Sequence, residues 1–111
     1  ILARRGWDVV GVPVRSVLHL KSAVTALPDG TIVGHPDHVD EPGAFAPFLA
    51  VPEPAGSHVV HIGERTLLMA ADAPQTAAIY RDMGYDVVEV DISEYEKLDG
   101  CVTCLSVRIR R

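Results

Sequence analysis

The chain repeats itself, and this internal repeat is the feature that most limits how it can fold. Residues 1–27, "ILARRGWDVVGVPVRSVLHLKSAVTAL", align without a gap on residues 79–105, "IYRDMGYDVVEVDISEYEKLDGCVTCL", with 10 identities in 27 positions. Repeats of this kind are typical of structural units that bury their apolar faces against one another. With 111 residues the chain is long enough for one small domain but not for two. We therefore expect one domain, residues 1–111, made of repeated units.

The second copy of the repeat predicts a helix that is followed by a strand. Asp72 and Pro74 are typical of a helix start, and Gly84 is typical of the residue that ends a helix. Residues 85–92, "YDVVEVDI", are rich in β-branched residues and predict the strand.

The first copy lacks most of the corresponding helix. Residues 1–5 alone precede Gly6, which aligns with the helix stop of the second copy. An isolated helix of that length is not stable. We therefore expect the chain to begin inside an element and to be a fragment of a longer protein.

Two hairpins and a long connection separate the two copies. Turn residues at Asp29-Gly30 and at Gly63-Glu64 each lie between two apolar runs and predict β-hairpins. The segment 36–56 is rich in Pro, Gly and acids and predicts a surface connection, with one helical turn at 44–49. The predicted order is strand, hairpin, loop, hairpin, helix, strand, strand, which indicates an α/β arrangement with helices on one side of small mixed sheets.

Composition excludes several classes of function. The formal charge of −5 gives no electrostatic footprint for nucleic acid and suits a cationic small molecule better. The chain has no run of ~18 apolar residues of the kind that a membrane helix needs. Two cysteines are far fewer than small secreted scaffolds carry, so we expect reduced thiols and a cytoplasmic protein.

Both cysteines lie in "GCVTCLSVRI", residues 100–109. They could be a redox pair, two metal ligands, or one nucleophile beside an uninvolved residue. The β-branched residues around them favour a strand, in which Cys101 and Cys104 would point to opposite faces about 10 Å apart. That distance exceeds the Cα separation of ~7 Å that a disulfide tolerates, so the pattern argues against a pair. Cys101 is expected to be a small apolar residue and Cys104 to lie on the polar face.

His19 is the partner that the repeat offers to Cys104. His19 aligns with Lys97 and Cys104 aligns with Ala26, so each copy carries one reactive side chain. Two units packed about a common axis could bring the two together, as Cys/His catalysis requires. The alternative is a hydrogen-bonded histidine on a mostly apolar strand. The remaining histidines are scattered through a loop and a strand, and we predict no metal site from them.

The segments "LHLKS" and "KLDGCVTCLS" resemble the dimethylarginine dimethylaminohydrolases of the guanidine-modifying superfamily. The related arginine deiminases follow the histidine with Leu-Asp and end the cysteine motif in Cys-Met, where Lys21 and Leu105 stand here. The resemblance implies a partial α/β propeller of the pentein fold, about two of five ββαβ-type blades, from the C-terminal part of the domain.

The resemblance also implies roles for three residues. It makes Cys104 the nucleophile, His19 the general acid and base, and Leu98 a residue whose backbone contacts the substrate. It implies hydrolysis of Nω-methylated arginines to citrulline without a cofactor or a metal. The partners would be a guanidine substrate and the N-terminal remainder of the same domain, with no nucleic acid and no membrane; a homodimer remains open.

Two other functions fit the same residues. One is an arginine deiminase or amidinotransferase with the same Cys/His pair, and the other is a pentein domain that only binds. In the family the carboxylates that bind the guanidinium precede the histidine, so we expect residues 1–111 alone to be inactive.

Overall fold

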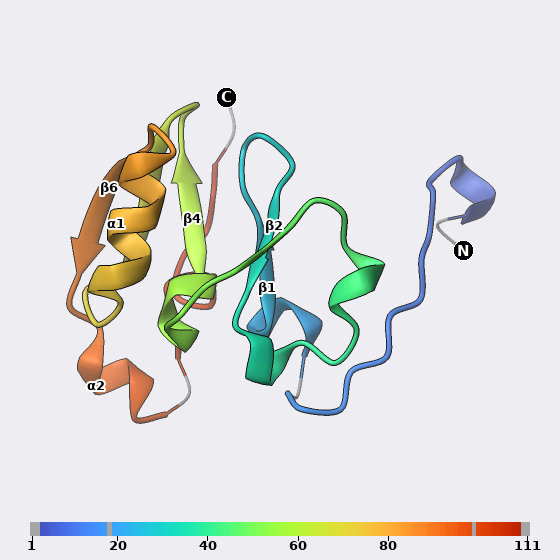
Figure 1. The fold of residues 1–111 in the computed structure, drawn as a ribbon, viewed down its shortest axis with the longest axis horizontal. Coiled ribbons are helices and arrows are strands. Elements are labelled where there is room, and N and C mark those ends of the chain that lie inside the picture. The colour runs from blue at the N-terminus through green and yellow to red at the C-terminus, as the bar shows by residue number, and fades with distance from the viewer. Residues whose placement is uncertain (1–2, 18, 99, 110–111) are drawn as a thin grey trace.

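The computed structural model describes residues 3–17, 19–98 and 100–109 (Figure 1). Its longest helix, α1, has nine residues, and no helix in these ranges is long and apolar enough to cross a membrane. Short 3-10 turns occur between several of the elements. The strands and α-helices, in chain order, are β1 (Val24–Ala26), β2 (Ile32–Gly34), β3 (Phe48–Ala50), β4 (Val59–Ile62), β5 (Thr66–Ala70), α1 (Pro74–Asp82), β6 (Asp86–Val90) and α2 (Ser93–Glu96).

The strands form two sheets of three strands each, and both sheets have the same topology. In the first sheet β1 pairs antiparallel with β2, and β2 pairs parallel with β3. In the second sheet β4 pairs antiparallel with β5, and β5 pairs parallel with β6. The predicted hairpins are therefore both present, and the prediction of small mixed sheets is confirmed.

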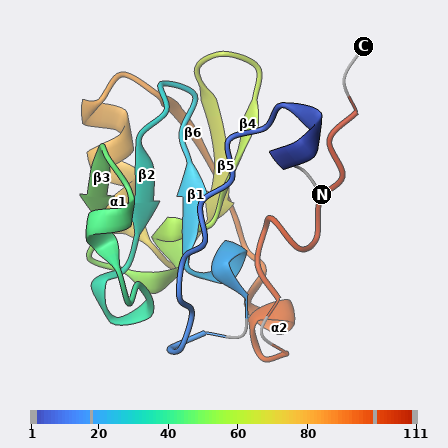
Figure 2. The same cartoon turned by 90° about the vertical axis from the view of Figure 1, so that its right-hand side faces the viewer.

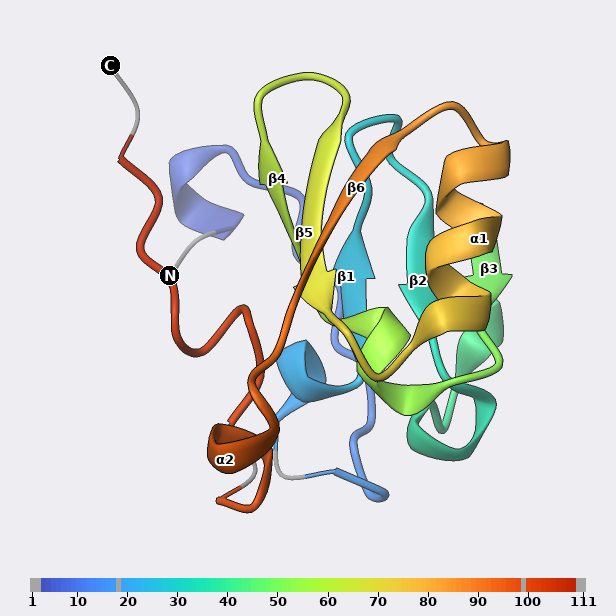
Figure 3. The ribbon, with the colours of Figure 1, turned by 90° about the vertical axis from the view of Figure 1, so that its left-hand side faces the viewer.

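Helix α1 occupies the crossover of the second sheet and packs against β6 (Figure 3). It begins at Pro74 and is followed by Gly84, as the sequence predicts. Gly84 and its counterpart in the repeat, Gly6, both have positive φ, +95° and +83°, which favours glycine at the end of a helical segment. Ala3–Arg5 form a 3-10 turn before Gly6, while residues 1–2 lie outside the described ranges.

The main core lies between the two sheets and α1. Buried residues of the second sheet and of α1 meet residues that flank or belong to the first sheet. The nine buried members of this cluster are Leu27, Val33, Val51, Val59, Leu67, Met69, Ala73, Ala77 and Tyr80. The two sheets are thus held together by one continuous apolar contact rather than by two separate cores.

Two predicted strands are absent, because neither finds a partner. Residues 7–14 and 102–109 carry strand-like sequences but lie outside both sheets (Figure 2). Trp7 is 66% exposed and Val107 is 90% exposed, so neither segment buries an apolar row. A strand needs a neighbour that satisfies its backbone groups, and no described strand runs beside these segments.

The predicted helical turn at residues 44–49 is also wrong. A 3-10 turn at Pro42–Ala44 ends earlier, and residues 48–50 form β3, which pairs with β2. Phe48 and Leu49 gain backbone partners and partial burial in the sheet, which outweighs the local preference for a turn.

Candidate active site

A cavity of about 780 Å³ opens where the segment before β1, the loop before β4 and the segment after α2 meet. Chemically reactive side chains from distant parts of the chain line it. They include three histidines, three carboxylates and both thiols: His19, His38, His58, Glu53, Asp72, Glu96, Cys101 and Cys104. The structure therefore brings the predicted catalytic residues His19 and Cys104 to one cavity from opposite ends of the chain.

His19 is exposed and stands at the start of a 3-10 turn, Leu20–Ser22. Its backbone is extended, and its carbonyl oxygen accepts a hydrogen bond from the N–H of Ser22 at 3.0 Å. The ring Nε2–H of His58 donates to the carbonyl oxygen of Ser22 at 2.6 Å. His58 thus fixes the turn that follows His19 to the segment that leads into β4.

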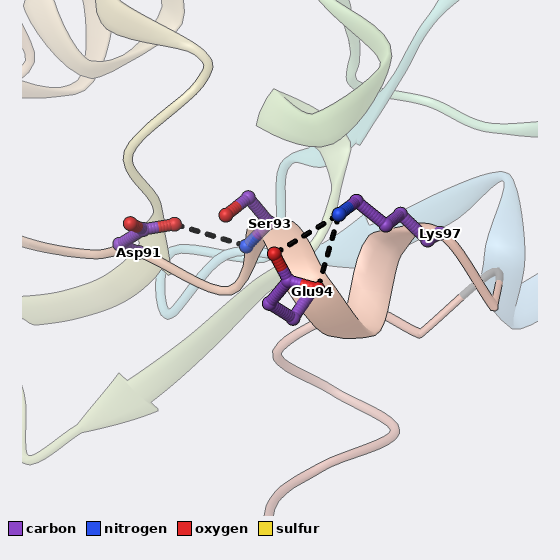
Figure 4. Close-up of polar contacts among 4 residues, drawn as sticks. All are labelled: Asp91, Ser93, Glu94 and Lys97. Atoms are coloured by element: carbon purple, nitrogen blue, oxygen red, sulfur yellow. Dashed lines mark hydrogen bonds and ion pairs between the residues drawn. The ribbon is translucent and has the colours of Figure 1, made fainter.

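Helix α2 lies between β6 and the segment with the two cysteines, and Figure 4 shows polar contacts at this helix. The carboxylate of Asp91 accepts a hydrogen bond from the N–H of Ser93 at 3.0 Å, and this bond holds the pKa of Asp91 below its usual value. On the exposed face of the helix, Lys97 lies 3.0 Å from Glu94. The first contact caps the start of α2, while the exposed ion pair adds little stability.

Gly100 turns the chain back after α2. The N–H groups of Leu98 and Gly100 both donate to the carbonyl oxygen of Tyr95, at 3.0 and 2.9 Å. A Cβ on Gly100 would lie 2.9 Å from that same oxygen, so a side chain there would force the turn open. The glycine of the cysteine motif therefore allows the close turn that precedes Cys101.

Leu98 does not line the cavity, and its side chain is 85% exposed. The predicted role concerns its backbone, not its side chain. That role remains a prediction.

Residues 101–106 form a turn where the sequence predicts a strand. The N–H of Leu105 donates to the carbonyl oxygen of Cys101 at 3.1 Å, and the hydroxyl of Ser106 donates to that of Val102 at 2.7 Å. In such a turn residues three apart lie on the same side, so Cys101 and Cys104 converge. Their sulfurs are 3.1 Å apart, which corrects the prediction that the two point to opposite faces.

The carboxylates Asp72 and Glu96 line the cavity, and no motif in the sequence marks them as residues of a site. A side-chain hydrogen bond with Asp72, together with partial burial and the charges of Asp72 and Asp91, raises the pKa of Glu96 to about 7. Asp72 is predicted only as a helix start, and nothing in the local pattern links it to a residue 24 positions later. With Glu53, these acids favour a cationic ligand.

The described residues hold no group of three or more His, Cys, Asp or Glu side chains arranged to bind a metal ion. His58 is instead used in a hydrogen bond to the backbone, as is His61, whose Nε2–H donates to the carbonyl oxygen of Ala26 at 2.9 Å. The cavity lining offers an exposed thiol, an exposed imidazole and nearby carboxylates.

No family model matches the chain. The N(G),N(G)-dimethylarginine dimethylaminohydrolase of Streptomyces coelicolor is 62% identical over 95% of this chain and 41% of that protein. A crystal structure of a dimethylarginine dimethylaminohydrolase histidine-to-glycine variant, in an adduct with S-methyl-L-thiocitrulline, matches with a TM-score of 0.81 and 31% identity. A cysteine-to-serine variant from Pseudomonas aeruginosa, in complex with citrulline, matches with a TM-score of 0.80 and 31% identity.

Both structures are covered to 43% of their length, and each match includes 97% of this chain. The chain thus spans less than half the length of the relatives it matches. The likeness confirms an α/β fold shared with these enzymes, while the number of propeller blades remains a prediction. The resemblance predicted from "LHLKS" and "KLDGCVTCLS" is confirmed: the chain is homologous to the dimethylarginine dimethylaminohydrolases over a region that makes up less than half of their length.

Proposed function

We propose that the complete protein hydrolyses Nω-methylated arginines to citrulline and methylamine or dimethylamine. The observation that carries this proposal is the meeting of His19 and Cys104 at one carboxylate-lined cavity. The 62% identity to a relative of that name supports the substrate class. Solved relatives that hold citrulline or an S-methyl-L-thiocitrulline adduct support it further.

In the first half-reaction the thiolate of Cys104 attacks the central carbon of the guanidinium and forms a carbon–sulfur bond. The resulting tetrahedral adduct loses the methylated amine as its carbon–nitrogen bond breaks. A guanidinium is a poor electrophile, so the attack needs a thiolate. The departing nitrogen needs a proton because an amide anion is a poor leaving group, and the imidazolium of His19 supplies that proton. A covalent thiouronium remains on the sulfur.

In the second half-reaction His19, now neutral, takes a proton from water as the water attacks the thiouronium carbon. The carbon–sulfur bond breaks and its electron pair restores the thiolate of Cys104, while the hydroxyl proton is lost to solvent as the carbonyl group of citrulline forms. The side chains of Asp72 and Glu96 contribute negative charge to the cavity that receives the cation. The scheme needs no cofactor, and the backbone of Leu98 is proposed to contact the substrate.

The rest of the proposed assembly follows from the homology. The two sheets share one topology, which supports their assignment as two blades of a five-bladed propeller. The remaining blades would come from the other part of the same domain, together with the carboxylates that grip the guanidinium. We therefore expect residues 1–111 alone to hydrolyse no dimethylarginine. A cytoplasmic location remains a prediction from the sequence, which leaves a homodimer open.

Incubating the complete protein with dimethylarginine, with arginine, or with arginine and an amine acceptor separates the candidate activities. We expect release of citrulline and dimethylamine from the first mixture alone. Cys104→Ser should abolish both this release and the covalent adduct with a haloacetamidine reagent, whereas Cys101→Ala should still form that adduct. Turnover of arginine instead of dimethylarginine would contradict the substrate, and equal loss of the adduct in both variants would contradict the assignment of one nucleophile.

A further inference from the structure

The two thiols are arranged for direct reaction with each other. The sulfurs of Cys101 and Cys104 lie 3.1 Å apart within one turn of chain. A disulfide bond is about 2.05 Å long, so the sulfurs need to approach by only about 1 Å. Turns of this kind are where Cys-x-x-Cys pairs react, because residues three apart converge there.

The two thiols differ in how open they are to solvent. Cys104 is exposed, whereas Cys101 is 8% exposed, and both line the same cavity. A small oxidant therefore reaches Cys104 first. Cys101 lies behind it, with its sulfur 2.9 Å from the hydroxyl oxygen of Thr103.

The surroundings of Cys101 favour its reactive form. Burial by itself raises the pKa of the Cys101 thiol, but side-chain hydrogen bonds with Thr103 and Cys104, helped by backbone hydrogen bonds from both, hold that pKa below its usual value. The thiolate is the form that attacks an oxidised sulfur. An accessible cysteine with a second thiolate beside it is the arrangement typical of reversible thiol oxidation.

We propose that Cys101 is a resolving cysteine, which traps a peroxide-oxidised Cys104 as a Cys101–Cys104 disulfide. In the first step the thiolate of Cys104 attacks one oxygen of hydrogen peroxide, the O–O bond breaks, and hydroxide leaves as a sulfenic acid forms. In the second step the thiolate of Cys101 attacks the sulfenic sulfur and expels hydroxide, which leaves the disulfide. The two thiols lose two electrons in total, which reduce the peroxide, and a dithiol reductant restores both thiols.

The disulfide would protect Cys104 from irreversible oxidation and would also make it unreactive. A sulfenic acid with no neighbouring thiol is oxidised further, to sulfinic and sulfonic acids that do not revert. The disulfide stops that sequence and at the same time removes the free thiolate of Cys104. The second consequence, a reversible loss of turnover, rests on the proposed function, whereas the formation of the disulfide does not.

Trypsin offers a direct readout, because cleavage after Lys97 and Arg108 places both cysteines in one peptide, residues 98–108. The complete protein is exposed to hydrogen peroxide, its free thiols are alkylated, and it is digested with trypsin. The mass of the peptide is then measured by mass spectrometry before and after reduction. We expect the oxidised peptide to be two hydrogens lighter than the reduced one and to carry no alkyl group. Reduction before alkylation should give a peptide with two alkyl groups.

Cys101→Ser is the matched control. Its peptide should gain two or three oxygens at Cys104 under the same exposure, and reduction should not remove them. Turnover of the oxidised wild type should return on reduction to its untreated rate, while oxidised Cys101→Ser should not recover its own untreated rate. A wild-type peptide with oxygens on Cys104 and an alkylated Cys101 would overturn the proposal. A disulfide in a protein without turnover would instead refute the proposed function and leave the resolving role intact.

Discussion

The first and second sheets have the same topology, yet the connections between their parallel strands differ in length and structure. Val24 pairs with Gly34 as Val59 pairs with Met69, so the two hairpins match at a spacing of 35 residues. In the parallel pairs, 16 residues separate Ile32 from Phe48, while 20 separate Leu67 from Val87. The second crossover is therefore longer by about one turn of helix.

The residues of the two crossovers explain what that extra length becomes. The first crossover, residues 35–47, contains three prolines and a glycine, which prevent a continuous helix. The second, residues 71–85, has its only proline at the first position of α1, where proline is tolerated, and it is rich in alanine. The same sheet plan can thus be covered by a helix or by irregular turns, depending on proline placement.

The size of one sheet residue differs between the two sheets, in keeping with the crossover that packs on it. Met69, at 0% exposed, belongs to the buried cluster that also holds Tyr80 of α1, whereas the matching position of the first sheet is Gly34. The side chain of Val39, from the first crossover, approaches Gly34 so closely that a Cβ there would lie 2.8 Å from it. A large residue under a helix and a glycine under a turn are two solutions to close packing.

The largest expected difference between the two crossovers comes from their aromatic residues. Tyr80 of α1 is fully buried and its hydroxyl donates to the carbonyl oxygen of Gly56 at 2.6 Å. Tyr80→Ala should destabilise the complete protein by about 3–5 kcal/mol, measured by denaturant unfolding. Phe45 of the first crossover is only half-buried, so Phe45→Ala should lower the free energy of unfolding by about 1 kcal/mol. Equal costs would mean that the two crossovers contribute alike to the core.

A smaller effect should follow from filling the space at Gly34. The added methyl of Gly34→Ala would meet Val39 at 2.8 Å and the carbonyl oxygen of Ala23 at 2.9 Å, and the backbone atom cannot move aside cheaply. We expect a loss of about 1–3 kcal/mol in the free energy of unfolding. Gly43→Ala, in open space within the same crossover, should change it by less than about 0.5 kcal/mol. A neutral Gly34→Ala would show that the first crossover does not rest on its sheet.

The smallest expected effect is a pH dependence of stability caused by Glu96, which lies at the end of α2. Because the pKa of Glu96 is raised from 4.5 to about 7, the folded state holds a proton there that the unfolded state has lost. Stability should therefore fall as pH rises through this window, since Glu96 must ionise beside Asp72 and Asp91.

Glu96→Gln cannot ionise, so its stability relative to wild type should grow between about pH 4.5 and 7 and then level off. Thermal unfolding at a series of pH values measures the gap. Glu94→Gln is the control, because its carboxylate lies 3.0 Å from Lys97 rather than beside another acid. A stability difference between Glu96→Gln and wild type that stays constant with pH would contradict the raised pKa of Glu96.

Elements that depend on neighbouring residues were predictable, and those that depend on distant partners were not. The turns at Asp29-Gly30 and Gly63-Glu64 and the helix between Pro74 and Gly84 follow from local sequence signals. The cap of α1 does not, because its first N–H groups donate to Glu53, more than 20 residues earlier, which accepts from Thr76 at 2.8 Å. The local sequence predicts Asp72 at the start of this helix, whereas in the structure Asp72 lines the cavity.

The site shows the same division. The repeat and the motifs point to His19 and Cys104, and the structure places both at the cavity, while their catalytic roles stay predictions. The position of the two cysteines relative to each other is not predictable in this way, because the β-branched residues favour a strand, and the described residues provide no partner for it. The turn depends instead on contacts such as the Gly100 N–H with the Tyr95 carbonyl, which no alternation of side chains reveals.

In the proposed mechanism Cys104 attacks the substrate carbon, while His19 serves first as an acid and then as a base. S-methyl-L-thiocitrulline, the compound bound in the histidine-to-glycine relative, separates the two roles, because a departing thiol needs no proton from His19. In the complete protein, His19→Gly should therefore form an adduct on Cys104 and release citrulline very slowly. His35→Gly, which lies outside the cavity lining, should release it at the wild-type rate.

Rapid-quench mass spectrometry of the peptide at residues 98–108 follows the adduct as it forms and decays. The adduct should accumulate in His19→Gly and decay quickly in wild type. Release of citrulline by His19→Gly at the wild-type rate would contradict the two roles of His19. So would a folded His19→Gly variant that binds the analogue and never acquires the adduct.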